Sequence, residues 1–541
     1  MDFEIPETLA NKLLERIDEN TPLSQRLAES GKYRGRSLVS SSLFEQNDLD
    51  TLHGLCEDEE EHALRLQVAS LSNIRRQPRG VGVEEFEVFV PALVAYLFKD
   101  MQDGWLYRRN QDGVMLPWLV SYVRAMTPDQ GAPYVIIGLL ANTIWSALRD
   151  SDGDSEQRFG GMTNAIVIHR YEMRGQTIPD LLAERGYFKE TEALQAEYSR
   201  HEKRFLELQP AFGAQYSCKQ AMFLANGPQD AEFMRLPRST AVKCVNDEGV
   251  LERSFDLAAD TTFWRELGVP TGFDRIPLHC YLYMFHLELH RHVWVHVQNV
   301  EPYEYKPELR EKLVLPESHR DLIDILTSDL EVFADDIVEG KSGGTIILCQ
   351  GAPGLGKTLT AEVYSEVVGK PLYRVHSGQL GITAASVEAN LSTVLQRASR
   401  WDAIMLLDEA DVYIRQRDND LQHNAIVAEF LRTLEYFNGL LFMTTNRIGD
   451  VDDAILSRCI ATIKYEIPPR DAAIRLWKTL SGQFGVQLSD ELVERLADTY
   501  NEASGRDIKE LLKLTARYCE SKKIPLSLEA FALCAVFRGL A

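Results

Sequence analysis

Residues 351–358, GAPGLGKT, combine glycines, a lysine and a threonine at a spacing suited to phosphate chemistry. They fit the pattern G-x-x-x-x-G-K-[ST], in which a glycine-rich turn lets backbone N–H groups close on phosphate oxygens. The apolar stretch 344–350 predicts a strand before the turn, and a helix is predicted after it, so the helix N-terminus adds partial positive charge. Lys357 would bridge the terminal phosphates, and Thr358 would be a ligand of Mg²⁺. With strand, turn and helix all in place, a chance glycine-rich turn is the weaker interpretation.

A second feature is a pair of acids that ends the apolar stretch AIMLLDE (403–409). Such a strand places its acids at the carboxyl edge of a parallel sheet, where ligands bind. There Asp408 would hold Mg²⁺, and Glu409 would orient and polarise an attacking water. Asn446 ends another apolar stretch and could hold the same water. Alone, these residues are more typical of a helix cap and a turn; beside the phosphate-binding turn they predict nucleotide hydrolysis.

The overall composition limits the classes of protein. The chain has 541 residues and a net charge of −23. This length predicts several domains, and the acidic balance argues against a broad nucleic-acid-binding surface. The eight scattered cysteines, without a CxxC pair, favour reduced thiols in a cytoplasmic protein. The acidic N-terminus is unlike a signal peptide, and the longest apolar run, 132–148, is predicted to be a buried helix rather than a membrane span.

The hydrophobic pattern divides the chain into five parts. Residues 1–150 are predicted to be a mostly helical N-terminal domain, and 151–300 a mixed α+β domain that binds a partner or substrate. Residues 301–340 would be a connector. Over 341–469 apolar strands alternate with helices, which predicts an α/β fold with a parallel sheet covered on both faces. Residues 470–541 are predicted to form a small, helical lid domain.

The front half carries no recognisable nucleophile pattern. Residues 239–255 predict a hairpin that turns at Asp247-Glu248-Gly249. Five histidines crowd the segment that follows, and His286 and His290 are four residues apart, as helical metal ligands often are. However, residues 292–300 alternate as a strand does, and no cysteine or carboxylate completes a zinc spacing, which favours core or exposed histidines over a metal site. The front half is therefore expected to bind rather than to catalyse.

The features of the second half, in this order, resemble the AAA family of the AAA+ ATPases, most specifically over residues 336–468. The glycine-rich turn is similar to Walker A, LLDEAD (406–411) to Walker B, and TTNR (444–447) to sensor 1. Longer strings resemble a mostly uncharacterised fungal and bacterial subgroup with a large N-terminal region and one ATPase domain. The resemblance implies a P-loop NTPase three-layer sheet with a small α-helical lid, ATP and Mg²⁺ as cofactors, and a ring that is usually a hexamer.

The resemblance also assigns individual residues. It implies that Arg458, in the triplet SRC, acts as an arginine finger on the γ-phosphate of a neighbouring copy, since a permanent forked charge suits phosphate oxygens. It implies that Arg506 touches the nucleotide from the lid; a surface arginine is the alternative in both cases. Arg447 and Arg432 could assist Arg458. The catalytic residues are then Lys357, Glu409, Asn446 and Arg458, the metal ligands Thr358 and Asp408, and the nucleotide-binding residues Gly351, Ala352, Pro353, Gly354, Leu355, Gly356, Lys357, Thr358, Leu359, Asp336, Ile337 and Arg506.

One loop departs from the pattern of family members that thread a substrate. Those members place an aromatic residue after the second strand, because an aromatic ring grips an extended peptide through a large contact area. Here residues 378–391 contain no aromatic residue, and Ile382 is the nearest bulky apolar one. Threading depends on this loop, whereas ATP hydrolysis does not.

The leading hypothesis is an ATP hydrolase, converting ATP and water to ADP and phosphate, that forms a homo-oligomeric ring and remodels or disassembles a protein target through its N-terminal domains. An alternative is a nucleotide-switched oligomeric scaffold or signalling protein without mechanical threading. A nucleic-acid loader, suggested by the SRC triplet, is the third hypothesis, and the acidic composition argues against it. The sequence does not identify the protein substrate or adaptor.

Overall fold

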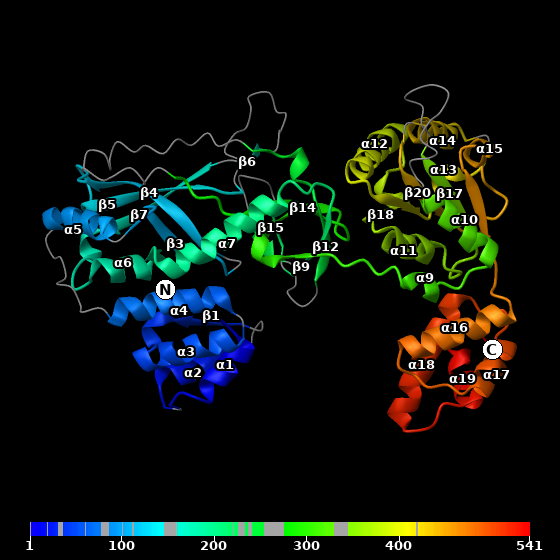
Figure 1. The fold of residues 1–541 in the computed structure, drawn as a ribbon, viewed down its shortest axis with the longest axis horizontal. Coiled ribbons are helices and arrows are strands. Elements are labelled where there is room, and N and C mark those ends of the chain that lie inside the picture. Colours follow the sequence, from blue (N-terminus) through cyan, green and yellow to red (C-terminus); the bar gives the residue numbers. More distant parts are fainter. Residues whose placement is uncertain are drawn as a thin grey trace.

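The computed structural model describes residues 2–540 with the exception of 19, 31–35, 60, 77–85, 100, 111–112, 145–157, 160, 220, 225–232, 236–240, 254–274, 329–343, 418–419 and 436. Along the chain it forms an N-terminal helical unit, two antiparallel sheets, a parallel α/β sheet and a C-terminal helical unit. The seven-stranded antiparallel sheet lies between the five-stranded antiparallel sheet and the α/β unit (Figure 1).

The N-terminal unit packs four helices against a two-stranded antiparallel sheet. Apolar residues at helical spacing, such as Leu9 and Leu13, form its buried core, because positions four apart share one helix face. A fifth helix, α5, packs on the sheet that follows through Phe89, Leu93 and Leu97. The elements are β1 (Asp2–Pro6), α1 (Glu7–Leu14), α2 (Pro22–Ser30), β2 (Arg36–Ser40), α3 (Gln46–Asp58), α4 (His62–Arg76) and α5 (Phe86–Phe98).

The next sheet has five antiparallel strands in the order β7-β5-β4-β3-β8. The helix predicted over 132–148 is wrong, since residues 134–142 form a strand of this sheet with most side chains buried. A short apolar run has no periodicity that separates a buried helix from a buried strand, and its β-branched residues favour the strand. The sheet joins strands on both sides of residue 150. They are β3 (Trp105–Arg109), β4 (Met115–Met126), β5 (Tyr134–Asn142), β7 (Gly161–His169) and β8 (Tyr187–Lys189).

A seven-stranded sheet follows, in the order β11-β10-β15-β14-β12-β9-β16. Helix α7 (Glu192–Leu208) shares its core through Leu194, Tyr198 and Phe205. The shorter helix α6 (Ile178–Glu184) precedes it. The strands are β9 (Gln215–Cys218), β10 (Met222–Leu224), β11 (Phe233–Arg235), β12 (Val242–Asn246), β14 (Tyr281–His286), β15 (Arg291–His296) and β16 (Val300–Pro302).

The hairpin predicted over 239–255 is also wrong. Strand β12 pairs with β9 and β14, while β13 (Glu252–Arg253) pairs with β6 (Arg158–Phe159). The acids that suggested an exposed turn, Asp247 and Glu248, are both buried and hydrogen bonded. Tertiary partners, rather than water, satisfy these carboxylates, so the local turn signal does not make a hairpin.

The α/β unit is a parallel sheet in the order β18-β19-β20-β17-β21, and its strands alternate with helices as the apolar pattern over 341–469 predicts. One apolar core lies between the sheet and α12 with α14, and another between the sheet and α11, which confirms the predicted α/β fold class. The strands are β17 (Thr345–Gly351), β18 (Leu372–His376), β19 (Ile404–Asp408), β20 (Leu440–Thr445) and β21 (Ala461–Tyr465). The helices are α9 (Leu309–Lys312), α10 (Glu317–Ser328), α11 (Lys357–Val368), α12 (Ala384–Arg400), α13 (Asp411–Ile414), α14 (Leu421–Leu434) and α15 (Asp453–Leu456).

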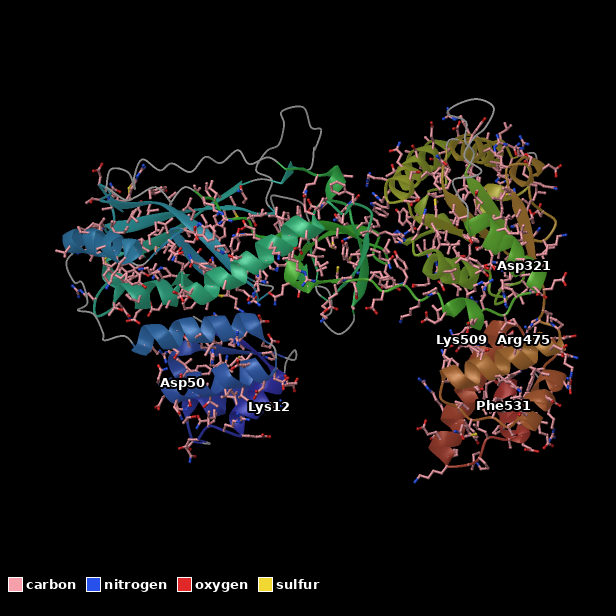
Figure 2. The ribbon with its side chains drawn as sticks, viewed as in Figure 1. Lys12, Asp50, Asp321, Arg475, Lys509 and Phe531 are labelled. Carbon is pink, nitrogen blue, oxygen red and sulfur yellow. The ribbon has the colours of Figure 1, made fainter. Side chains whose placement is uncertain are left out.

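The C-terminal unit consists of α16 (Arg470–Gln483), α17 (Asp490–Thr499), α18 (Gly505–Lys522) and α19 (Leu528–Val536). Its core is built around Trp477 and Phe531, whose rings meet edge to face at 5.6 Å, and Phe531 lies inside the bundle (Figure 2). Pro468 and Pro469 separate it from the last strand of the sheet, and α16 begins at the next residue. Within the described residues of 2–540, no helix is both long and apolar enough to cross a membrane.

A buried acid joins the seven-stranded sheet to the α/β unit. The side chain of Asp247 is 1% exposed and accepts hydrogen bonds from Arg400 (2.8 Å) and from Trp401 Nε1 (2.7 Å), both at the end of α12. His292 Nε2 lies 2.7 Å from its other oxygen. Burial opposes the charge, but these partners hold the pKa of Asp247 below its usual range. The rings of Phe285, Tyr373 and Trp401 pack beside this network, so the junction has an apolar core and a buried ion pair.

A second buried acid fastens the same sheet to α11. Glu366 accepts from Lys243 Nζ (2.9 Å), the hydroxyl of Tyr303 (2.6 Å) and the backbone N–H of Lys306 (3.1 Å). Burial opposes its ionisation, yet the contacts with Lys243 and Tyr303 lower its pKa. The front half is thus attached to the helix that starts at Lys357.

Replacing Asp247 by alanine should destabilise the protein by about 2–4 kcal/mol, because Trp401 Nε1 and the Arg400 charge lose a buried acceptor. Urea unfolding followed by tryptophan fluorescence measures the change. Glu301→Ala is the matched control, since Glu301 pairs with Lys219 on the surface and should contribute less than about 1 kcal/mol. Equal effects of the two substitutions would contradict the role given to Asp247.

Three buried histidines lie close together where the two antiparallel sheets meet. The rings of His201 and His296 are 4.7 Å apart, and His279 Nε2 lies 2.9 Å from the carbonyl oxygen of Pro117. Burial lowers the pKa of His201 and of His279 to about 4 each, and that of His296 well below its usual range. In the folded protein these rings therefore stay neutral under conditions that protonate them in the unfolded chain.

Acidification from about pH 6.5 towards pH 4 should destabilise the protein, because the unfolded chain binds protons that these folded histidines do not. At pH 5, His201 and His279 should each cost about 2 kcal/mol relative to pH 7.5. His279→Gln should reduce the difference in unfolding free energy between the two pH values by about that amount. Urea unfolding at each pH, followed by tryptophan fluorescence, measures this difference. An unchanged pH dependence in the variant would show that His279 is not one of the groups responsible.

Candidate nucleotide site

The turn between β17 and α11 has the backbone of a phosphate cradle. Gly354 and Gly356 have φ values of 83° and 96°, a left-handed region that favours glycine. A Cβ on Gly351 would lie 2.4 Å from the carbonyl oxygen of Tyr465, so the chain approaches β21 too closely for a side chain. Helix α11 begins at Lys357, and its first N–H groups therefore face the turn.

Lys357 lies at the centre of the site. Its Nζ donates to the carbonyl oxygens of Gly351 and Ala352, each at 2.8 Å, and to Asn446 Oδ1 at 2.9 Å. Burial lowers the pKa of this amine, and the charge of Asp408 opposes that effect. The lysine and the strand-end asparagine, 89 residues apart in sequence, are thus brought into direct contact as the sequence analysis expects of one site.

Asp408 is a buried acid with three hydrogen-bond donors, and its side chain is only 5% exposed. Oδ1 accepts from the hydroxyls of Thr358 (2.9 Å) and Thr444 (2.6 Å), and Oδ2 accepts from Arg374 Nη2 (2.6 Å). Burial favours the protonated acid, but these three donors together hold the pKa of Asp408 below its usual range. The carboxylate is therefore charged and fixed in orientation.

Glu409 follows directly and has a strained backbone, with φ at 55°. Its N–H donates to Thr444 Oγ1 over 3.0 Å, so Thr444 fixes both acids. The backbone N–H of Asn446 donates to Asp411 Oδ1 (3.1 Å), which also accepts from the hydroxyl of Thr445. The ends of β19 and β20 are thus held in one hydrogen-bonded arrangement at the carboxyl edge of the sheet.

The C-terminal unit touches the glycine-rich turn directly. The backbone N–H of Arg506 donates to the carbonyl oxygen of Gly354 over 3.1 Å. A Cβ on Gly354 would meet Ser504 Oγ at 2.6 Å. The backbone of Arg506 is therefore at the site, while its side chain is exposed.

Arg458 lies outside the contacts made by Lys357 and Asp408. Its Nη1 donates to the carbonyl oxygen of Ala454 (3.2 Å), and its Nη2 is 3.8 Å from Glu435 Oε2. Its side chain is about one-third exposed, which leaves the guanidinium accessible from outside the subunit. Arg447 forms an ion pair with Asp450, 2.7 Å away.

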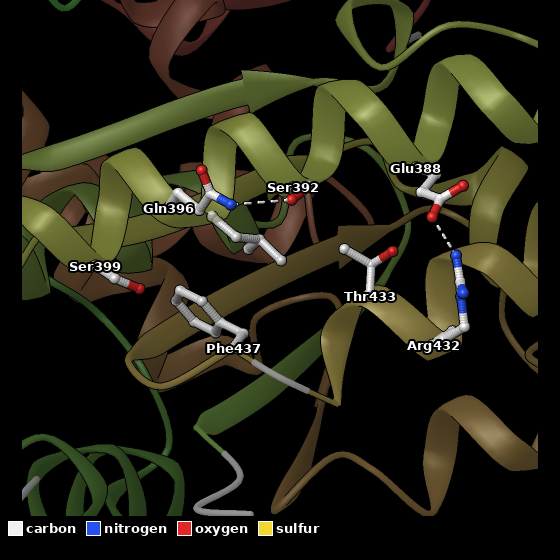
Figure 3. Close-up of a pocket in the computed structure, with 8 residues that line it drawn as sticks. Glu388, Ser392, Gln396, Ser399, Arg432, Thr433 and Phe437 are labelled. Carbon is white, nitrogen blue, oxygen red and sulfur yellow. Dashed lines mark hydrogen bonds and ion pairs between the residues drawn. The ribbon is translucent and has the colours of Figure 1, made fainter. Parts of the chain in front are cut away.

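Arg432 faces a groove between α12 and α14, on the face of the sheet opposite α11 (Figure 3). It forms ion pairs with Glu388 and Glu429. The groove has a volume of about 620 Å³ and is lined by Glu388, Ser392, Leu395, Gln396, Ser399, Arg432, Thr433 and Phe437.

The residues present fit a nucleotide with Mg²⁺. The oxygens of Thr358 and Asp408 already lie together, and hard oxygen donors suit Mg²⁺. The cradle at Gly351 and Gly354 has no room for side chains, as close backbone approach to phosphates requires. Leu359, which follows the glycine-rich turn, lies in the first helical turn of α11 and is half-exposed. Asp336 and Ile337, expected among the nucleotide-binding residues, lie outside the described residues.

Thr444, Asp411 and Arg374 belong to the site, although the sequence patterns assigned them no role. Thr444 lies in the stretch TTNR (444–447) and Asp411 in LLDEAD (406–411). Their positions were therefore visible in the sequence, but their contacts were not. Arg374 alternates with the buried residues Tyr373 and Val375 on β18. This period of two indicates that Arg374 lies on the other face of the strand, but it does not indicate the contact with Asp408. Among the described residues, no group of three or more His, Cys, Asp or Glu side chains could hold a metal ion.

Comparisons with known proteins agree with this geometry. Residues 347–467 match the model of the ATPase family associated with various cellular activities (AAA). An uncharacterized AAA family ATPase of Sinorhizobium fredii is 30% identical over 138 residues, which are 24% of this chain and 40% of that protein. The mitochondrial Lon protease homolog of Candida albicans is 26% identical over 232 residues, 37% of this chain and 21% of that protein. Spastin of Sus scrofa is 25% identical over 178 residues, 31% of this chain and 29% of that protein.

The chain thus spans between 21% and 40% of the length of these curated relatives. Among solved structures, a chain of the E. coli HORMA:CdnC:Trip13 complex is similar with a TM-score of 0.36 and 17% identity, over 42% of this chain and 90% of that one. The family match, over residues 347–467, covers most of the α/β unit that carries the site. This chain therefore contains an ATPase domain of the AAA family, which confirms the resemblance seen in the sequence.

Proposed function

We propose that the AAA-family ATPase domain of this chain binds ATP with Mg²⁺ and hydrolyses it to ADP and phosphate. The observation that carries the proposal is the contact of Lys357 with Asn446 beside the pair Thr358 and Asp408. The ends of two strands, β19 and β20, and the start of α11 have to meet to bring these four side chains together. Such a meeting point at a glycine-rich turn suits a triphosphate and its cation.

In this proposal each side chain has a distinct task. Thr358 and Asp408 would hold Mg²⁺, which when bound neutralises charge on the phosphates. Lys357 exchanges its contacts with the turn carbonyls for phosphate oxygens. Glu409, held by Thr444, accepts a proton from the attacking water, and Asn446 orients that water. Gly351 to Leu359 enclose the phosphates, and Asp336, Ile337 and Arg506 are proposed to contact the base and the lid side of the nucleotide.

We further propose that copies of the chain form a ring, of six in the usual arrangement of the family. Arg458 supports this proposal, because it is accessible and its contacts are with Ala454 and Glu435 rather than with its own phosphate cradle. In a ring it would reach the γ-phosphate held by the next copy and neutralise charge there. Arg447 and Arg432 are the alternatives for this role.

The front half is proposed to bind a protein target that ATP turnover remodels or disassembles. Its buried junctions through Asp247 and Glu366 support such coupling, since they connect it to α12 and α11 of the ATPase domain. All eight cysteines are free, and seven of them are buried, which suits a cytoplasmic location. A nucleic-acid loader remains the least favoured function because of the net charge of −23.

One observation favours a second candidate, a nucleotide-switched scaffold. Ile382, in the loop where substrate-threading members carry an aromatic residue, is 83% exposed. An isoleucine offers less contact area to an extended peptide than an aromatic ring. ATP-dependent dismantling of a captured complex would support the remodelling function, while slow turnover indifferent to any protein substrate would support the scaffold.

Glu409→Gln should bind ATP but hydrolyse it about 10²–10⁴-fold more slowly, because the amide cannot accept the proton of the water. Phosphate release and retention of labelled ATP after gel filtration measure the two effects. Glu301→Gln is the control, since Glu301 pairs with Lys219 on the surface of the front half, away from the site. Normal turnover by Glu409→Gln would exclude it as the base.

Arg458→Ala should bind ATP and lose about 10³–10⁵-fold in turnover. Mixing it with Glu409→Gln should restore part of the activity, because a Glu409→Gln subunit offers an intact Arg458 to a neighbour whose base is intact. Arg432→Ala and Arg447→Ala, assayed in parallel, distinguish the alternative arginines. No recovery in the mixture, or full activity of Arg458→Ala alone, would contradict the exchange of arginines between copies.

A further inference from the structure

Arg374 puts a positive charge directly on the carboxylate that the proposed function assigns to Mg²⁺. Its Nη2 donates to Asp408 Oδ2 over 2.6 Å, and its Nη1 lies 3.5 Å from Glu362 Oε1 on α11. The guanidinium thus lies between two acids, one on β19 and one on the helix that starts at Lys357. Neither the glycine-rich turn nor the acid pair gives this arginine a role.

The fold restricts the position of the Arg374 side chain. Tyr373 and Val375 are buried in the core shared with α12, so alternation along β18 turns Arg374 toward α11. Its buried Nε has no hydrogen-bond partner in the part of the chain that the structure describes. The two carboxylates are therefore what holds the side chain in position.

The arrangement sets up a competition for Asp408. Of the two carboxylate oxygens, Oδ1 already accepts from Thr358 and Thr444, and Oδ2 accepts from Arg374. A divalent cation at Thr358 would meet an acid whose charge is largely balanced, beside a like charge that repels it. The phosphates of a nucleotide would supply the missing negative charge.

We propose that Arg374 is a positioning residue that balances the charge of Asp408, so that the site takes up a divalent cation together with nucleotide phosphates and not before them. The proposal rests on the Mg²⁺ site of the proposed function and adds the order in which its charges assemble. Arg374 also keeps the Asp408 carboxylate oriented while the site holds no phosphate.

The test measures binding of Mn²⁺ alone to nucleotide-free protein, by the electron paramagnetic resonance signal of free Mn²⁺. Arg374→Gln should bind Mn²⁺ with a Kd about tenfold lower than the unmodified chain, because a screened like charge is removed from the site. Arg374→Lys keeps the charge and should stay within about threefold of the unmodified chain. Arg200→Gln makes the same change in net charge on the exposed face of α7 and should leave Mn²⁺ binding unchanged.

Asp408→Asn in the Arg374→Gln background should remove the gained binding, which locates the ion at this carboxylate. Three results would each overturn the proposal. They are equal Mn²⁺ affinities of Arg374→Gln and Arg200→Gln, weaker Mn²⁺ binding by Arg374→Gln than by the unmodified chain, and gained binding that survives Asp408→Asn. The readout needs no turnover. If Arg374→Gln gains Mn²⁺ binding but the unmodified chain does not hydrolyse ATP, this inference stands and the proposed function is refuted. If the unmodified chain hydrolyses ATP but Arg374→Gln gains no Mn²⁺ binding, the proposed function stands and this inference is refuted.

Discussion

One buried carboxylate, Asp408, is the interaction on which the site depends. It takes hydrogen bonds from the helix start through Thr358, from β20 through Thr444 and from β18 through Arg374. A buried charge is costly unless such partners satisfy it, so its partners have to stay in place. Through Thr444 the same network sets the backbone of Glu409. The spacing of the strand ends is therefore fixed by the acid that they share.

A similar constraint joins the front half to the ATPase domain. Asp247 and Glu366 are buried acids, and each accepts hydrogen bonds from donors across the junction. Sliding one unit past the other would leave charges and N–H groups without partners, at a cost of several kcal/mol. The C-terminal unit is held differently, since at the glycine-rich turn its contact is the N–H of Arg506 on Gly354, beside Ser504. That hydrogen bond is a weaker restraint than the contacts of the two buried acids.

The histidines and the short apolar segments show where local sequence patterns do not predict the structure. His292 was expected to lie on a strand, and it does, but its partner is an aspartate that sequence alone places in an exposed turn. Residues 134–142 are apolar enough for a helix or a strand, and pairing with β4 and β7 decides between them. In each case a long-range partner outweighs the local preference.

The sequence by itself determined the α/β fold of the second half and predicted which strand ends would meet, because the glycine-rich turn, the acid pair and the strand-end asparagine each follow an apolar strand. Parallel strands bring their carboxyl ends to one edge, so spacing along the chain becomes proximity in space. Only the tertiary structure placed Arg374 on Asp408 and buried Asp247 between two units. Those contacts join residues 34 and 153 positions apart through side chains, and no periodicity along the chain encodes which side chains will meet.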